Sequence, residues 1–354
     1  MTTDAKILSA LRRNPNGVSG AHLAEQLAIS RAAVWARIEE LRQVGYGIEA
    51  GPHFGYRLVS SPDALHADDL LAHLAVLPVE RDSVGRDSVE PKSTIRAGIR
   101  ETFAPPKIIG RDIQVFKETT STNDVIEKLA RDGVREGVVV FAESQTRGRG
   151  RLGRKWVSPA NKGLWFSVLL RPDLHPQETT QLTVASATAL RRAIIAQTGL
   201  RPEIKWPNDI LIGGKKVAGI LTELSAELDR VKHIILGIGV DVNVAADELP
   251  PEVRQLATSL KIEAGAHISR VELAAEILRE LDRDYARICA GKFSGVADEW
   301  EAGCATIGKN VTVQMGDRKI SGCAESLDDD GALLVRTQHG HLERVIGGDV
   351  TLEK

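Results

Sequence analysis

Apolar residues near the N-terminus recur at the spacing of one helix face. Ile7, Leu8 and Leu11 fit a first helix, and the Asn14–Gly17 segment after them is typical of a turn. A second short helix is predicted over Ser19–Leu27, where two leucines lie one helical turn apart. The chain therefore begins with a small helical module.

The third predicted helix begins after Ser30, whose hydroxyl suits an N-cap, and it carries Val34, Ile38 and Leu41 on its inward face. β-Prone residues interrupted by glycine and proline over 47–59 predict a hairpin. Helix, helix, turn, helix and hairpin is the order of a winged helix-turn-helix. We therefore predict a DNA-binding domain of this type at the N-terminus.

The middle of the chain mixes short apolar runs with amphipathic stretches. The runs predict strands over Val138–Ala142, Leu164–Leu170, Ile210–Ile212, Val217–Leu224 and His233–Ile238. Helical spacing predicts helices over Ser121–Arg131, Gln181–Thr198 and Arg270–Ala290. Gly213-Gly214 indicates a tight hairpin between two of the strands. This irregular order favours an α+β domain over a repeated βαβ fold.

The last fifty residues alternate short β-prone runs with glycine-containing turns. Strands are predicted over Val311–Met315, Ile320–Leu327, Ala332–Thr337 and His341–Ile346, which suits a small barrel. Residues 78–106 are charged and proline-containing, which indicates a linker or surface insertion. The expected segments are 1–60, a linker and insertion over 61–106 that could include a connecting helix over 60–76, a central domain over 107–300, and 301–354.

Charge and cysteine content narrow the class of protein. With 46 basic and 48 acidic residues the net charge is −2, so any nucleic-acid binding must come from a local patch. Residues 1–58 carry seven basic and five acidic side chains, a slight local excess of positive charge. The three cysteines are too scattered for a metal motif or a disulfide framework. With no apparent signal peptide and no apolar run long enough for a membrane span, we expect a soluble, cytoplasmic protein.

The strongest chemical signal is the segment Arg147–Trp156, with five basic side chains, three glycines and no acid. Glycine permits close backbone approach to a ligand, and arginine offers forked donors to phosphate or carboxylate. The segment is not a P-loop, since it lacks the required lysine and hydroxyl pattern. A nucleic-acid-binding loop or a solvated run of charge is the alternative. The position of Arg147–Trp156 between two apolar strands favours a lid over an anionic ligand.

Four further strings carry candidate chemistry. Lys205–Asp209 could bind phosphate, a ribose or Mg²⁺, or could be a plain turn. Lys216 opens an apolar strand that contains Gly219, which indicates close approach by a ligand, although an exposed lysine at a hairpin is equally consistent. Gly237-Ile238-Gly239 suits the floor under a flat ligand. Thr120–Asn123 either caps a helix or binds a small polar ligand.

In combination these strings resemble those of the bacterial biotin–protein ligases, in particular the bifunctional ones that also repress the biotin operon. The matching strings are Ser121–Asn123, Gly148–Trp156, Lys205–Asp209, Lys216–Leu221 and Gly237–Gly239, in the family's order. The resemblance also includes the N-terminal winged helix and the small C-terminal barrel. It implies a central mixed sheet like that of biotinyl and lipoyl ligases, which is similar to class II synthetases, followed by an SH3-like barrel.

The resemblance implies a role for each matching residue. Biotin would be bound by Ser121, Thr122, Asn123, Gln145, Arg149, Gly150, Arg151, Lys216, Gly219, Gly237 and Gly239. ATP would be bound by Arg154, Trp156, Lys205, Asn208, Asp209 and Asp241, with Trp156 stacking on adenine. Arg151, Lys216 and Asp209 would be catalytic, with Asp209 a candidate to orient or deprotonate the acceptor lysine. The recognition helix would use Ser30, Arg31 and Arg37 on DNA.

Two features depart from the family pattern. Asp241 stands where the family usually has an asparagine that helps to hold the nucleotide and metal, although a carboxylate could also serve Mg²⁺. The 78–106 segment is longer than the expected linker.

The implied activity is ATP-dependent, with Mg²⁺, and attaches biotin to a lysine of the biotin carboxyl carrier protein. The implied partners are that carrier protein, operator DNA and a second copy of the chain bound on adenylate formation, with no membrane. A lipoate or other acyl–protein ligase, or a transcription factor that senses a ligand without catalysis, is the alternative, and the winged helix could instead serve protein contacts.

Overall fold

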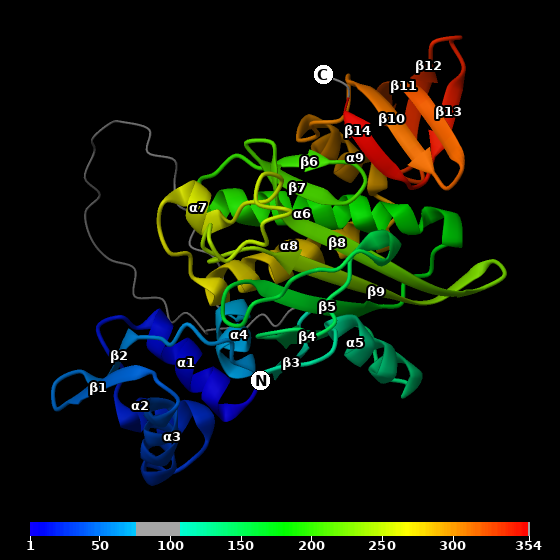
Figure 1. Ribbon diagram of the computed structural model, residues 1–354. Coiled ribbons are helices and arrows are strands. Elements are labelled where there is room, and N and C mark those ends of the chain that lie inside the picture. The colour runs from blue at the N-terminus through cyan, green and yellow to red at the C-terminus, as the bar shows by residue number, and fades with distance from the viewer. Residues whose placement is uncertain (76–106, 353–354) are drawn as a thin grey trace, which may run out of the picture.

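The computed structural model describes residues 1–75 and 107–352, so the predicted insertion lies outside the described residues. Its N-terminal module contains α1 (Thr3–Arg13), α2 (Gly20–Leu27) and α3 (Arg31–Gln43), then the hairpin β1 (Gly47–Gly51) and β2 (Gly55–Ser60). These elements enclose their own apolar core, which includes Leu8, Leu23 and Ile38. The predicted winged helix-turn-helix is confirmed (Figure 1).

Helix α4 (Ala67–Leu74) joins this module to the rest of the protein. It packs against α1 on one side and α8 on the other. Ala72 belongs to the N-terminal core, whereas Leu70 and Leu74 belong to the central core. The fully buried Asp69 of α4 forms an ion pair with Arg12 of α1. The predicted connecting helix thus ties the two cores together.

The central sheet has seven strands in the order β3-β4-β5-β9-β8-β7-β6. Only β3 and β4 pair in parallel among the described strands. The bounds are β3 (Asp112–Phe116), β4 (Val138–Ala142), β5 (Leu164–Leu170), β6 (Glu203–Lys205), β7 (Asp209–Ile212), β8 (Lys215–Glu227) and β9 (Arg230–Val240). The five predicted strands are confirmed, and the short β3 and β6 are additional.

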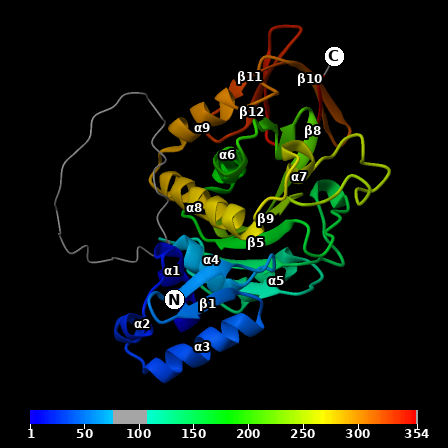
Figure 2. The ribbon, with the colours of Figure 1, turned by 90° about the vertical axis from the view of Figure 1, so that its left-hand side faces the viewer.

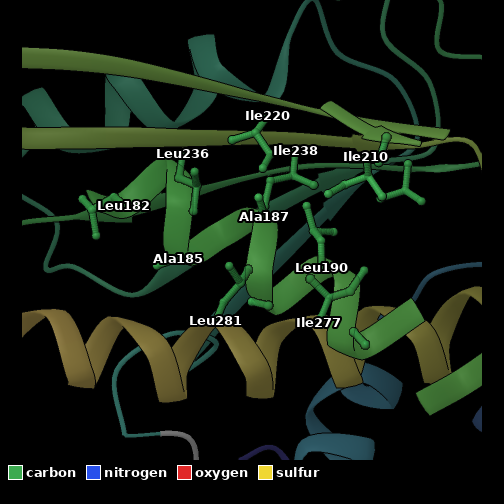
Figure 3. Close-up of a cluster of buried hydrophobic side chains, with 14 of the residues drawn as sticks. Leu182, Ala185, Ala187, Leu190, Ile210, Ile220, Leu236, Ile238, Ile277 and Leu281 are labelled. Carbon is green, nitrogen blue, oxygen red and sulfur yellow. The ribbon is translucent and has the colours of Figure 1, made fainter. Parts of the chain in front are cut away.

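Both faces of the sheet are covered, which explains why its strands read as continuous apolar runs. Helices α6 (Thr180–Thr198) and α8 (Arg270–Cys289) lie on one face, and Leu190, Leu281 and Ile238 of β9 belong to the same buried cluster (Figure 3). Helix α5 (Thr122–Arg131) packs through Ile126 on the other face (Figure 2). All three predicted helices are confirmed, and the class is α+β. The remaining short elements here are η1 (Arg151–Gly153), η2 (Pro176–Thr179) and α7 (Leu260–Ala264).

The C-terminal part is a five-stranded antiparallel sheet in the order β13-β12-β11-β10-β14. Its strands are β10 (Asn310–Met315), β11 (Arg318–Leu327), β12 (Leu333–Thr337), β13 (Leu342–Val345) and β14 (Asp349–Leu352). The predicted boundary at 300/301 falls inside α9 (Phe293–Ala302), which packs on α6 through the buried Trp300. Among residues 1–75 and 107–352, no helix is both long and apolar enough to cross a bilayer.

Candidate functional site

The candidate residues come together where β5, β9 and β8 lie side by side. Strand register places Trp165, Gly239 and Gly219 in one row across the three strands. The next row on the same face of the sheet is Ser167, Gly237 and Leu221. The glycines at 219, 237 and 239 leave gaps between the side chains of this face, so other groups can lie directly on the backbone there.

A chain of polar side chains lies beside these rows. The Thr122 backbone N–H donates to Gln145 Oε1 at 2.8 Å, and Gln145 Nε2 donates to Ser158 Oγ at 2.9 Å. The Thr122 and Ser167 hydroxyls are 2.6 Å apart, and Ser167 Oγ donates to Asn123 Oδ1. Five polar residues, three predicted and two not, are therefore connected and largely buried. Ser167 and Ser158 were missed, because a lone serine in or near an apolar strand gives no sequence signal.

Asn123 lies directly over Gly237. A Cβ atom at position 237 would come 2.4 Å from Asn123 Oδ1, so only glycine allows this approach. Ser121 is the N-cap residue of α5 and is buried, yet its hydroxyl makes no cap hydrogen bond within the described chain. At the start of this helix, Thr122 and Asn123 contact Ser167 of the sheet.

The glycine- and arginine-rich segment folds back on itself as a tight loop. The Trp156 N–H donates to Gly148 O at 2.9 Å, and the Gly150 N–H donates to Arg154 O at 2.7 Å. A Cβ atom at 148 would lie 2.5 Å from Trp156 O, which explains glycine at that position. The loop tip carries Leu152, which is 71% exposed and has a φ of 56°. The segment is thus an ordered loop with an exposed tip, beside the glycine rows.

Arg149 is paired with two carboxylates. Its Nη1 lies 2.6 Å from Asp124 Oδ1, and its Nε lies 3.0 Å from Glu223 Oε1. The hydrogen bonds to Glu223 and then to Asp124 raise the pKa of Arg149, against an opposing effect of burial. The pKa of Asp124 is lowered, because hydrogen bonds from Arg149 and Thr120 outweigh its desolvation. Glu223 was not predicted from the sequence.

Arg151 and Arg154 connect the loop to residues in two other parts of the protein. Arg151 Nη1 donates to Asn208 Oδ1 at 3.1 Å and to Gly348 O at 3.4 Å. Burial lowers the pKa of Arg151, which remains far above neutrality in proteins. Arg154 forms an ion pair with Asp349 at the start of β14. The C-terminal sheet therefore borders the site, a contact that no sequence motif indicated.

Lys216 and Asp209 form an ion pair, with Nζ 2.6 Å from Oδ1. The connection between β6 and β7 places Asp209 there, opposite Lys205 in the strand register. Asn208 of the same connection donates from Nδ2 to Ile220 O at 2.7 Å. Two polar side chains of the string, Asn208 and Asp209, therefore border the same region as the loop.

The Trp156 ring covers the row of glycines. Cβ atoms at Gly219 and Gly239 would lie 2.9 and 2.6 Å from this ring. Lys216 Nζ is 5.1 Å from one ring centroid of Trp156, a cation–π distance. The indole N–H is buried without a hydrogen-bond partner in the described part of the chain. A flat ligand lying on these glycines must therefore displace the indole.

Asp241 is buried at the end of this region, just after β9. Burial raises its pKa to about 8, and the nearby Lys216 opposes that shift. Its backbone is fixed, because its N–H donates to Val217 O and its carbonyl accepts from Leu260 N–H. Near neutral pH the side chain is mostly a neutral acid, with one O–H donor and one carbonyl acceptor. It thus offers the same pair of functions as the amide expected at this position.

The predicted DNA-contacting helix is α3. Ser30 caps it, with Oγ accepting from the Ala33 N–H at 3.1 Å. Arg31 is exposed on the first turn, and Trp35 is 57% exposed one turn later. Arg37 forms an ion pair with Glu40 at 2.7 Å, so its guanidinium is already partly neutralised. Among the described residues, no group of three or more His, Cys, Asp or Glu could hold a metal ion.

Comparison with known proteins agrees with this arrangement. Residues 4–57 match an HTH domain, residues 115–241 the biotin/lipoate A/B protein ligase family, and residues 306–352 the biotin protein ligase C-terminal domain. The chain is 36% identical over 335 residues to the bifunctional ligase/repressor BirA of Bacillus subtilis, covering 95% of this chain and 94% of that protein. It is 28% identical to BirA of Escherichia coli, over 98% and 96%.

A solved structure supports the same assignment for the central and C-terminal parts. The biotin protein ligase of Aquifex aeolicus, in complex with biotin and ATP, is 31% identical with a TM-score of 0.59. The match covers 69% of this chain and 99% of that one. Full-length relatives at this identity establish the family, and the HTH match extends it to the N-terminal domain. The chain therefore belongs to the family of bifunctional biotin–protein ligase/repressors.

Proposed function

We propose that this biotin–protein ligase activates biotin with ATP and transfers it to a lysine of a carboxyl carrier protein, using the residues described above. The observation that carries the proposal is that a largely buried polar chain and two cationic groups flank the same glycine-containing rows of the sheet. The polar chain of Thr122, Asn123 and Gln145 suits a ureido ring, which both donates and accepts hydrogen bonds. The cations Arg151 and Lys216 suit a carboxylate and a phosphate.

In the first step a carboxylate oxygen of biotin attacks the α-phosphorus of ATP, and pyrophosphate leaves. Two anions must approach, so fixed cations aimed at the developing charge lower the barrier. Lys216 and Arg151 would supply this charge, and Arg154 and Lys205 would hold the nucleotide. ATP would enter as its Mg²⁺ complex, in which the metal neutralises phosphate oxygens.

In the second step the amine of the acceptor lysine attacks the carbonyl carbon of the mixed anhydride, and AMP leaves. The amine must lose a proton, and Asp209 is the candidate to accept or orient it. Its ion pair with Lys216 also positions that cation. Trp156 would leave Gly219 and Gly239 when biotin binds there, and the displaced indole would then stack on adenine.

We also propose that the winged helix binds operator DNA in response to the adenylate, which would favour a homodimer. The support is the exposed face of α3, with Arg31 and Trp35 one turn apart. Arg37 would have to exchange its partner Glu40 for a phosphate. Carrier protein and operator are both cytoplasmic, so we place the protein there.

Pyrophosphate release by the purified chain tests the enzymatic proposal. Mg-ATP is supplied with biotin, with lipoate, or with no acid. We expect release only with biotin, its loss in Lys216→Ala, and no change in Lys215→Ala, an exposed neighbour on the same strand. Release with lipoate alone would indicate a lipoyl ligase, and no release from folded protein would indicate a ligand sensor without catalysis.

A further inference from the structure

Glu223 lies at a junction between the loop and the polar chain. It belongs to β8, outside every string that carried the family resemblance. Its Oε2 accepts from Asn123 Nδ2 at 2.7 Å and from Arg149 Nη2 at 3.1 Å, while Oε1 accepts from Arg149 Nε at 3.0 Å. One carboxylate therefore holds both a residue assigned to biotin and a residue of the loop.

The orientation of Asn123 depends on this carboxylate. Ser167 donates to Asn123 Oδ1, and Glu223 accepts from Asn123 Nδ2. These two neighbours therefore fix the orientation of the Asn123 amide. An anionic acceptor makes the second hydrogen bond the stronger type. The side chain of Asn123 is consequently fixed over Gly237 before any ligand arrives.

Arg149 has little capacity left for a ligand anion. Three of its five N–H donors already point at carboxylate oxygens of Glu223 and Asp124. Two negative charges face one guanidinium, so the charge of Arg149 is neutralised by its own partners. An incoming carboxylate or phosphate would be repelled by the same two acids that hold the arginine.

We infer that Glu223 is a positioning residue that anchors the loop through Arg149 and orients Asn123, and that Arg149 is an anchor rather than a clamp on the ligand. This inference rests on the proposed adenylate-forming function and revises the role that family resemblance gave Arg149. The anionic ligand is then left to Arg151, Arg154 and Lys216.

The anchor and the clamp predict opposite effects of removing the Glu223 charge. If Arg149 is an anchor, Glu223→Gln loosens the loop, and the adenylate escapes faster. If Arg149 is a clamp that Glu223 restrains, the same substitution frees the guanidinium, and the adenylate escapes more slowly. Glu227→Gln is the matched control, because Glu227 is an exposed acid four residues along the same strand.

The experiment forms the adenylate in the wild-type and variant proteins and follows its dissociation by filter binding. We expect Glu223→Gln to dissociate about three- to tenfold faster than Glu227→Gln, the size typical of losing a partly exposed charged contact. Combining Glu223→Gln with Arg149→Gln should increase the dissociation rate little beyond that of either single variant. An unchanged or slower rate, or fully additive effects, would overturn the inference, whereas absence of adenylate in the wild type would refute the proposed function instead.

A second measurement needs no ligand. Trypsin cleavage between residues 149 and 155, followed by mass spectrometry on ligand-free protein, reports how firmly the loop is held. We expect cleavage at least threefold faster in Glu223→Gln than in Glu227→Gln. Equal rates would overturn the anchor. Should Glu223→Gln fail to fold, Arg149→Gln takes its place. If Arg149 is an anchor, this substitution speeds cleavage at the remaining sites. If Arg149 is a clamp on the ligand, the cleavage rate of ligand-free protein does not change.

Discussion

Substituting Asp241 by asparagine should make the protein more stable at alkaline pH and leave its stability in acid unchanged. The carboxyl is buried after β9, and burial raises its pKa to about 8 from an ordinary value of 3.8. Asparagine has nearly the same shape and keeps one donor and one acceptor. The substitution therefore removes the ionisable group while the side chain at position 241 keeps its packing.

The sign follows from which state holds the proton. Below pH 4 the acid is neutral in both the folded and the unfolded chain. Between pH 4 and pH 8 the unfolded chain ionises it while the folded protein keeps the proton, so the free energy of unfolding falls as the pH rises. With a folded value of about 8 and an unfolded value of 3.8, the fall from pH 5 to pH 8 is about 3.5 kcal/mol, at about 1.4 kcal/mol per pH unit.

Urea unfolding of both proteins in ligand-free buffer, at intervals from pH 5 to pH 8, measures this difference. Subtracting the two curves cancels the other titrating groups, and the exposed Asp229→Asn serves as a control for loss of charge alone. We expect the advantage of Asp241→Asn to grow by about 3 kcal/mol over this range. A difference that stays constant within about 0.5 kcal/mol would show that Asp241 is ionised in the folded protein, and the reasoning would be wrong.

Two other substitutions test contacts of the loop and of α4. Arg151→Ala should release the adenylate about ten- to a hundredfold faster, because a half-buried cation is lost. Filter binding measures the dissociation rate, with the exposed Arg147→Ala as the control. Equal dissociation rates in the two variants would refute this prediction. Asp69→Ala should destabilise the N-terminal domain by about 3 kcal/mol, since Arg12 would be left nearly buried without its partner. A loss of less than about 1 kcal/mol in the free energy of unfolding, measured with denaturant, would contradict a structural role for that pair.

Most of the fold was predictable because the sheet is buried on both faces. β4 and β5 were predicted at their observed bounds, since every residue in them is buried and apolar runs of that length are distinctive. β3 was missed because its edge position exposes Asp112 and dilutes the pattern. β6 and β14 have only three and four residues, too few for a period to emerge. Helix α9 was also missed, although Phe293, Val296 and Trp300 have helical spacing.

The site was predictable only where a motif concentrates unusual residues. Glycine and arginine in one short loop, or lysine followed by a proline-containing turn, are visible along the chain. Glu223, Ser167 and Asp349 are not, because each is an ordinary residue in a strand that becomes relevant through its neighbours in space. Such partners depend on strand register, which the sequence alone did not specify.

Three of the four arginines of the loop, Arg149, Arg151 and Arg154, are attached to different parts of the protein, and these attachments differ in strength. Arg154 meets Asp349 across two well-exposed side chains, 66% and 41% accessible, a type of pair that contributes about 0–1 kcal/mol. Arg149 is held by three charged hydrogen bonds to two acids on α5 and β8. The weaker attachment should break first. The loop should therefore open at its C-terminal end, away from the small sheet, and pivot about Arg149, so that the nucleotide side of the site opens while the biotin side keeps its arrangement.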